Sequence, residues 1–253
     1  MSFRGQPRLP RAEDKSEARR SGLTVGARPA IPFLGQTPPV KIVVVEDQAM
    51  VRGLVSRVCR DAFPAAEIAE AGDGASALAA CQRLRPDLLL LDLELPDTDG
   101  LDLLGELRRH APPAMRVLVL SSHTEPFSLS RLRSAQIHGF VDKNEQSPET
   151  LCTALREVVA GRPYFSAVVD RGHAALRADP RAFDKLLSDR EQELLRLFGQ
   201  GLSNEEVAAR HGLTPVTARN HRRNIMGKLG IHSTPELIQY ALENGFARIR
   251  PRG

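Results

Sequence analysis

Short apolar runs alternate with longer amphipathic segments through the middle of the chain. The runs that predict strands are Lys41–Val45, Glu67–Glu70, Leu88–Leu91, Val117–Leu120 and Gly139–Val141. The segments that predict helices lie near Val51–Cys59, Ala75–Leu84, Leu101–Arg109, Leu129–Ala135 and Glu149–Ala160. Five strands alternating with helices predict a five-stranded, doubly wound parallel sheet, an α/β fold of the flavodoxin-like kind. The common strand order 2-1-3-4-5 would place the first and third strands side by side.

The pattern changes after residue 184, where short helices with clear start signals follow one another. Ser188 and Ser203 each open a capping box, and Thr214-Pro215 and Thr234-Pro235 each combine an N-cap with proline at the first helical position. Glycines follow the expected helix ends, at Gly201, Gly212, Gly230 and Gly245. We therefore predict a small all-α domain of four helices.

Two further segments divide the chain. Residues 161–183 lack a sustained period and predict a linker, with room for a short helix. Residues 1–38 are basic, rich in proline and without periodicity, which predicts a disordered tail. A DNA-contacting arm and a transit peptide are the alternatives for that tail. The expected division is thus a tail over 1–38, an α/β domain over 39–160, a linker over 161–183 and a helical domain over 184–250.

Composition narrows the class of protein. The chain has 253 residues and three cysteines, Cys59, Cys81 and Cys152, whose number and spacing fit neither a disulfide framework nor a CxxC motif. No apolar run approaches the roughly 18 residues of a membrane span, and the first residues lack the apolar core of a signal peptide. We therefore expect a cytoplasmic protein with no membrane partner. Residues 184–253 hold 11 Lys and Arg against 8 Asp and Glu, which permits nucleic-acid contact without requiring it.

Polar residues gather where the predicted strands end. Asp92 follows the buried run Leu88–Leu91, and Glu46-Asp47 follow the first strand. Neighbouring strand ends with three carboxylates predict a site for a hard divalent cation such as Mg²⁺. Ser121 follows the fourth strand and Lys143 follows the fifth, so a hydroxyl and an ammonium group join the carboxylates.

This set of strand-end residues resembles the receiver domains of bacterial two-component response regulators, over about half of the chain. The resemblance implies that Asp92 accepts a phosphoryl group from a sensor histidine kinase. It further implies that Glu46, Asp47 and Asp92 hold Mg²⁺ together with the backbone carbonyl of Glu94. Two residues would act on the phosphoryl group: Ser121 by hydrogen bonding and Lys143 by charge. Phe140 would be a switch aromatic, with a plain core role as the equally weighted alternative.

The physics of phosphoryl transfer agrees with this assignment. A carboxylate and a phosphoryl group repel each other, so the site must neutralise charge and hold the reactants in line. Any one element has a simpler explanation, since a single Asp at a strand end often caps the next helix and a single Lys is often a surface charge. Jointly the five elements favour a phosphoacceptor. Such a receiver assists its own phosphorylation and dephosphorylation and is otherwise not an enzyme.

The segment Glu205–His211, followed by a tight turn and a longer basic helix, has the helix-turn-helix pattern. From Gly201 to Gly230 it resembles the LuxR-type DNA-binding domain, and the two domains together resemble NarL/FixJ-type response regulators. The resemblance implies a transcription factor controlled by phosphorylation. The chain departs from the family pattern at Ala218 and at Pro215-Val216, which bears on the DNA sequence recognised more than on the fold.

Two opposite rows of side chains are expected on the long basic helix. One row, Ala218, Arg222, Ile225 and Leu229, should face the domain, and the other, Arg219, Asn220, Arg223 and Gly227, should face DNA. Arginine suits guanine and asparagine suits adenine, whereas Thr217 and Lys228 are better phosphate ligands. A solvated basic face is the alternative. His221 is expected to be a structural histidine.

The last predicted helix carries Ile238 and Leu242 on a stripe beside the residues that pack on the domain. The resemblance implies that this helix forms a homodimer on promoter DNA when the protein is phosphorylated, with RNA polymerase as a further candidate partner. We hypothesise that the receiver covers part of this surface until Asp92 is phosphorylated.

Two other classes of protein share single features with this sequence. Asp92-Leu93-Glu94 resembles the DxD signature of aspartyl-phosphate phosphatases, but in that family the nucleophile ends the first strand. The nearer rival is a LuxR-type transcription factor controlled by a ligand or a partner, with a receiver that is not phosphorylated. Small-molecule sensors of that type use aromatic-lined pockets, and this chain has no Trp and two Tyr.

Overall fold

The computed structural model describes residues 39–109, 114–144 and 147–248. The predicted tail over residues 1–38 and the last two residues of the predicted helical domain lie outside the described residues.

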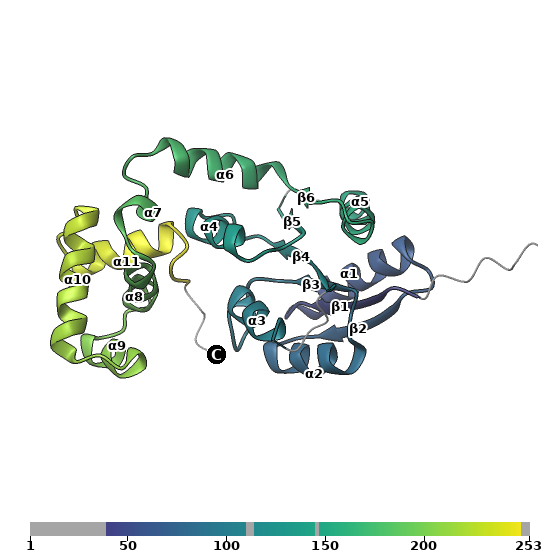
Figure 1. Ribbon diagram of the computed structural model, residues 1–253, viewed down its shortest axis with the longest axis horizontal. Helices are drawn as coiled ribbons and strands as arrows, with labels where there is room; N and C mark the ends of the chain where they lie inside the picture. Colours follow the sequence, from purple (N-terminus) through teal and green to yellow (C-terminus); the bar gives the residue numbers. More distant parts are fainter. Residues whose placement is uncertain (1–38, 110–113, 145–146, 249–253) are drawn as a thin grey trace, which may run out of the picture. The chain divides into compact units, whose positions relative to one another are not determined.

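Within the described residues, the first domain is built on a six-stranded parallel sheet (Figure 1). The strands are β1 (Lys41–Val45), β2 (Glu67–Ala71), β3 (Leu88–Leu91), β4 (Arg116–Ser121), β5 (Gly139–Asp142) and β6 (Tyr164–Phe165). Their order is β2-β1-β3-β4-β5-β6, and Val45 pairs with Leu91. The predicted fold class and the predicted order of the first five strands are confirmed. The expected number of five strands was too low, because β6 comes from the segment predicted as a linker.

Helices cover both faces of this sheet. They are α1 (Ala49–Ala62), α2 (Gly74–Leu84), α3 (Gly100–Leu107), α4 (Pro126–Ser134) and α5 (Pro148–Val159). In β3 all four leucines are buried, because successive side chains point to opposite faces and both faces are covered. Leu88 and Leu90 belong to the core cluster with α1 and α5. Leu89 and Leu91 belong to the cluster with α2 and α3. Because both faces of the sheet are buried, the ends of its strands are fixed relative to one another.

The segment after α5 packs on the same domain. It contains β6, α6 (Ala167–Ala178) and α7 (Phe183–Leu186). Val169 of α6 lies in the core cluster that contains Phe140 and Leu129. Gly172 lets α6 approach α4 closely, since a Cβ atom there would lie 2.2 Å from Leu129 Cδ1. The predicted linker therefore includes a strand and a helix that help to bury the core.

The remaining helices form the second domain: α8 (Asp189–Gly199), α9 (Asn204–His211), α10 (Pro215–Leu229) and α11 (Thr234–Glu243). The predicted capping boxes at Ser188 and Ser203 are present, and the Thr214 side chain accepts a hydrogen bond from the backbone N–H of Thr217. The N-cap of α11 is Ser233 rather than the expected Thr234, because the Ser233 side chain accepts from the Glu236 N–H. No helix among the described residues is long and apolar enough to cross a membrane.

Candidate functional site: a strand-end acidic cluster and an exposed helix face

The structure brings the predicted carboxylates together. Asp92 follows β3 directly, and its backbone N–H donates to the Val45 carbonyl at 3.0 Å, which holds the ends of β1 and β3 side by side. One carboxylate oxygen from each of Glu46, Asp47 and Asp92 lies within 4.8 Å of the others. Glu46 and Asp92 are buried, whereas Asp47 is exposed. The exposed Asp47 thus places the cluster at the surface of the domain.

Lys143 reaches into this cluster from the end of β5. Its Nζ lies 2.8 Å from Asp92 Oδ2 and 2.5 Å from Glu46 Oε2. Burial alone would lower the pKa of Lys143, but the two carboxylates raise it above its ordinary value. Burial raises the pKa of Glu46 above its ordinary value, and the hydrogen bond from Lys143 opposes this only in part. The ammonium group is therefore charged at neutral pH and held beside Asp92.

The donor set fits a magnesium ion. Three carboxylates against one ammonium leave an excess of negative charge, and oxygen is the ligand that Mg²⁺ prefers. The carboxylate of Glu94 is engaged with His123, since Glu94 Oε2 lies 2.7 Å from His123 Nε2. These residues have the chemistry to hold a divalent cation beside Asp92.

Ser121 ends β4 and is fully buried. Its Oγ accepts a hydrogen bond from the His123 N–H at 3.2 Å, and its carbonyl accepts one from the Lys143 N–H at 3.1 Å. The ends of β4 and β5 are thereby tied together. The hydroxyl predicted to bind the phosphoryl group and the lysine come from adjacent strand ends.

Two residues that the sequence did not reveal support this edge of the sheet. Arg52 on α1 donates through Nη1 to the backbone carbonyls of Glu46 at 2.6 Å and Asp47 at 3.1 Å. His123 lies between Glu94 and Glu125. Its hydrogen bonds with the two carboxylates, above all with Glu125, raise the pKa of His123 against the effect of burial. Neither residue directly follows a strand, so their role is visible only in the folded chain.

Phe140 is fully buried in the cluster with Leu129 and Val169. Its carbonyl accepts a hydrogen bond from the Ser166 N–H at 2.9 Å. This position is the one expected of a core residue, and a switch role stays a prediction.

Gly100 at the start of α3 touches the backbone of the predicted phosphoacceptor. A Cβ atom at this position would lie 2.2 Å from the Asp92 carbonyl oxygen and 2.8 Å from Leu93 Cα. Both neighbours are backbone atoms just beyond β3, so they cannot move aside at low cost. Glycine is required here by close approach.

We expect Gly100→Ala to lower the free energy of unfolding by about 1–3 kcal/mol and to slow phosphorylation, because overpacking would displace Asp92. Gly105→Ala, on the same helix with open space around its Cβ position, is the matched control and should be neutral or stabilising by up to about 1 kcal/mol. Thermal unfolding and labelling by a phosphodonor measure the two effects. Equal stability of the two variants would contradict the packing argument.

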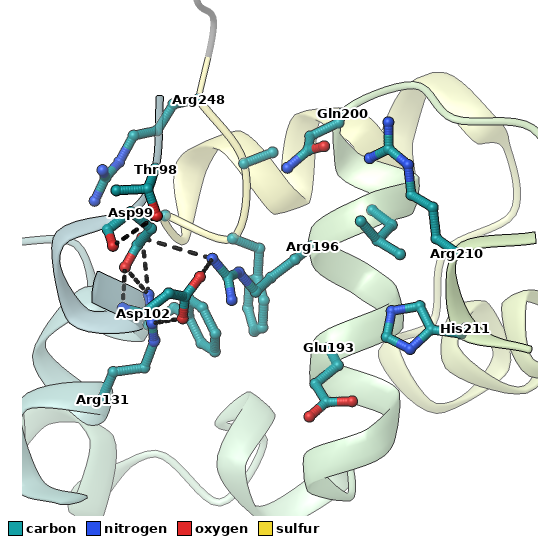
Figure 2. Close-up of a pocket in the computed structure, with 15 residues that line it drawn as sticks. Thr98, Asp99, Asp102, Arg131, Glu193, Arg196, Gln200, Arg210, His211 and Arg248 are labelled. Atoms are coloured by element: carbon teal, nitrogen blue, oxygen red, sulfur yellow. Dashed lines mark hydrogen bonds and ion pairs between the residues drawn. The ribbon is translucent and has the colours of Figure 1, made fainter. Parts of the chain in front are cut away.

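Asp99, which precedes Gly100, organises a charged cluster (Figure 2). Its Oδ1 accepts from the Leu101 N–H at 3.0 Å and caps α3. Arg131 of α4 donates to both Asp99 oxygens at 2.9 Å, and Arg196 of α8 lies 3.5 Å from Asp99 Oδ2. Burial opposes ionisation, but the arginines, Arg131 foremost, hold the pKa of Asp99 below its ordinary value.

Because the folded-state pKa of Asp99 is lowered, its contribution to stability is present above its ordinary pKa of 3.8 and is lost as pH falls through the lower folded value. Asp99→Asn keeps a capping side chain but loses the charge, and should cost roughly 1.5–3 kcal/mol at neutral pH. Urea unfolding across the acid range should show the gap to wild type closing as pH falls. Asp102→Asn, at a half-exposed position, is the control and should cost less than about 1 kcal/mol.

The second domain meets α4 through aromatic rings. Phe127 at the start of α4 stacks on Phe246 with centroids 4.0 Å apart, and both rings contact Phe183 edge-on. The Phe127 N–H donates to the Asn244 carbonyl at 2.9 Å, and Arg248 Nη1 donates to the Leu93 carbonyl at 3.3 Å. A cleft of about 710 Å³ lies beside these contacts, lined by α3, α4, α8, α9 and residues 245–248 (Figure 2). The residues after α11 thus touch the loop that follows Asp92.

On α10 the two predicted rows are found. Ala218 and Ile225 are buried and Arg222 and Leu229 are half-buried, whereas the opposite row is exposed: Arg219, Asn220, Arg223 and Gly227. The structure shows no ion pair for Arg219 or Arg223 with any described residue. This face of α10 offers two unpaired guanidinium groups and an amide to a ligand.

The other basic residues of α10 have partners inside the domain. Arg222 donates to Thr234 Oγ1 at 2.7 Å and lies 5.3 Å from the centre of the Phe198 ring. Lys228 Nζ lies 2.7 Å from Glu191 Oε2. Thr217 lies at the capped start of the helix, with its hydroxyl 2.8 Å from Thr214 Oγ1. His221 is half-buried. Lys228 therefore supports the domain in addition to any role at a phosphate.

Comparison with known families gives a match for each of the two domains. The response regulator receiver domain matches residues 42–156, and the luxR family of bacterial regulatory proteins matches residues 185–241. The chain is 35% identical over 222 residues to the DNA-binding transcriptional activator DevR/DosR of Mycobacterium tuberculosis, covering 85% of this chain and 98% of that protein. It is 30% identical over 213 residues to the transcriptional regulatory protein MctR of Rhizobium johnstonii, covering 83% and 96%.

Among solved structures, similarity extends to RcsB of Salmonella enterica serovar Typhimurium bound to promoter rprA in the presence of the phosphomimetic BeF3⁻. The identity is 25%, the TM-score is 0.60, and the match covers 80% of this chain and 98% of that one. The matches to both families, and to relatives over nearly their whole length, show that the chain belongs to the two-component response regulators with a receiver domain and a LuxR-type helix-turn-helix domain, which bind DNA to control transcription.

Proposed function

We propose that Asp92 is the phosphoacceptor of this response regulator and that a sensor histidine kinase is its phosphodonor. The observation that carries the proposal is the contact between Lys143 Nζ and Asp92 Oδ2 at 2.8 Å, inside a cluster of three carboxylates at adjacent strand ends. An isolated helix cap would need neither the lysine nor the acidic pair Glu46-Asp47.

The chain's own residues would act by position and charge. An oxygen of Asp92 attacks the phosphorus atom, and the bond between phosphorus and the kinase histidine nitrogen breaks as the new P–O bond forms. Lys143 pairs with the phosphoryl oxygens, and the Ser121 hydroxyl donates a hydrogen bond to one of them. We propose that Glu46, Asp47, Asp92 and the backbone carbonyl of Glu94 hold Mg²⁺. Bound Mg²⁺ supplies charge neutralisation between the carboxylates and the phosphoryl group.

At the other site we propose that α10 enters the major groove of promoter DNA. Arg219, Asn220 and Arg223 would contact base edges, because they form the exposed and unpaired face of the helix. Thr217 and Lys228 would contact phosphates. The protein would act in the cytoplasm as a homodimer when phosphorylated, with RNA polymerase as a further candidate partner.

The contacts around Phe127 support control of DNA binding by phosphorylation. Arg248 donates to the carbonyl of Leu93, the residue next to Asp92, and Phe127 begins the helix that follows the Ser121 loop. A change at either strand end would act on the residues that follow α11. We propose that phosphorylation weakens these contacts and favours dimerisation through α11 on DNA.

One experiment separates this proposal from a ligand-controlled or partner-controlled regulator. The full chain is incubated with Mg²⁺ and a small phosphodonor, and both acyl phosphate and affinity for promoter DNA are measured. We expect stoichiometric acyl phosphate and tighter DNA binding together. DNA binding that is unchanged while acyl phosphate accumulates would favour the rival function.

A charged substitution on α11 tests the proposed dimer interface. Ile238 of α11 is half-buried, while Leu237 and Ala241 on the neighbouring face of the helix fill the core. Ile238→Asp should keep the fold but lower dimer formation of the phosphorylated protein on DNA by at least tenfold, because a charge at a two-fold axis meets its copy. Sedimentation with a labelled promoter fragment measures this. Gln239→Asp, at an exposed position, is the matched control, and equal dimerisation of both variants would place the interface elsewhere.

A further inference from the structure

An apolar side chain is exposed to solvent at the start of α10. Val216 is the second residue of the helix, and 65% of its surface is exposed. Of the large hydrophobic residues that are strongly exposed in the described part of the chain, it is the one that lies in α8–α11.

The fold does not explain this valine. It belongs neither to the core cluster of the second domain nor to the partly buried side chains packed against that cluster. Valine is also a poorer helix former than alanine. Neither packing nor helix propensity therefore accounts for a valine here.

The position of Val216 on α10 places it on the face proposed to read DNA. Val216 stands three, four and seven residues before Arg219, Asn220 and Arg223, so the four side chains form one exposed face. Residues at the N-terminal end of a helix in the major groove are those that reach base edges. The Cβ atom of Val216 should lie about 5–6 Å from that of Arg219, which is less than two steps of roughly 3.4 Å along the bases of one strand.

We propose that Val216 contacts the C5-methyl group of a thymine, within two base pairs of the base contacted by Arg219. The inference rests on the proposed DNA-reading face of α10. The methyl group is the apolar feature of the major groove and distinguishes thymine from the other bases. Arginine and asparagine cannot use it, since they recognise hydrogen-bonding atoms. An apolar residue beside them adds recognition of a thymine to that of guanine and adenine.

The test begins with a site selected by the phosphorylated full chain from a random duplex library. Each thymine in a half-site is then replaced by deoxyuridine, which removes the methyl group and leaves the hydrogen-bonding edge unchanged. Affinities are measured for wild type, Val216→Ala and Val216→Thr. Arg219→Ala is included to test the DNA-reading face independently.

At one thymine in each half-site, deoxyuridine should weaken wild-type binding about fourfold, the value for one buried methyl-sized group. Val216→Thr keeps a methyl group at the same place and should retain this sensitivity, whereas Val216→Ala should lose it. Equal sensitivity of Val216→Ala and wild type at every thymine would overturn the proposal. If Arg219→Ala also kept full discrimination between the selected site and random DNA, the proposed DNA-reading face itself would be wrong. If only Arg219→Ala lost discrimination, the face would stand and the role of Val216 would be rejected.

Discussion

Asp92→Asn should abolish Mg²⁺-dependent labelling of the protein by a small phosphodonor. The amide has no anionic oxygen to attack phosphorus and is a weak metal ligand, so both the nucleophile and part of the cation site are lost. The fold should persist, because the side chain keeps its shape and the backbone N–H of residue 92 still donates to the Val45 carbonyl. Lys143 also keeps Glu46 as a partner. Labelling is measured by intact mass, and folding by thermal unfolding.

Asp87→Asn is the matched control for this result. Asp87 precedes the same strand at its opposite end, where its Oδ2 accepts a hydrogen bond from the Lys41 N–H at 2.9 Å. The variant removes one carboxylate from the same domain without touching the cluster, so its labelling should equal that of wild type. Undiminished labelling of Asp92→Asn would move the phosphoacceptor to another residue.

Arg219→Ala should reduce discrimination between a selected site and random DNA by about 1–3 kcal/mol, or roughly 5- to 150-fold. The guanidinium of Arg219 is exposed and has no described ionic partner, so its loss should not disturb the domain. Arg222→Ala removes the same charge from the inner row, where the side chain is held by Thr234 and Phe198. It should lower stability and leave discrimination nearly intact. Binding to both DNAs and thermal unfolding of both variants decide between them.

Lys228→Ala should behave differently from Arg219→Ala. A phosphate contact carries no sequence information, so selected and random DNA should weaken alike and the salt slope should fall by about one. Some stability should also be lost, because Lys228 holds Glu191, whose carboxylate accepts from Ser188 as well. Equal effects of Lys228→Ala and Arg219→Ala on both DNAs would refute the division of roles.

The strand-end cluster could be predicted from the sequence because parallel topology alone brings the carboxyl ends of β1 and β3 together. Asp92 and Asp47 therefore needed only the correct strand order. The exposed row of α10 was predictable for a similar reason, since helical periodicity separates Arg219 and Arg223 from Ala218 and Ile225.

Other features required the folded chain. His123 joins Glu94 to Glu125 across two loops, and loop conformation has no periodic signal. Ser233 and Thr234 are both good N-cap residues, so the backbone before α11 decides which of them caps the helix. Gly100 stands directly after a residue that caps α3, and only the distance to Asp92 shows why the position lacks a side chain.

The strand β6 has a practical consequence for how the protein can be divided. It has two residues, too few for an alternating pattern, yet it pairs with β5, and the Ser166 N–H just beyond it donates to the Phe140 carbonyl. A receiver fragment cut at Ala160 would lose this pairing together with Val169, leaving the edge of β5 unpaired and the pocket around Phe140 underfilled. Such an edge invites pairing between molecules. Self-association of that fragment would therefore result from the truncation and would not indicate how the intact regulator assembles.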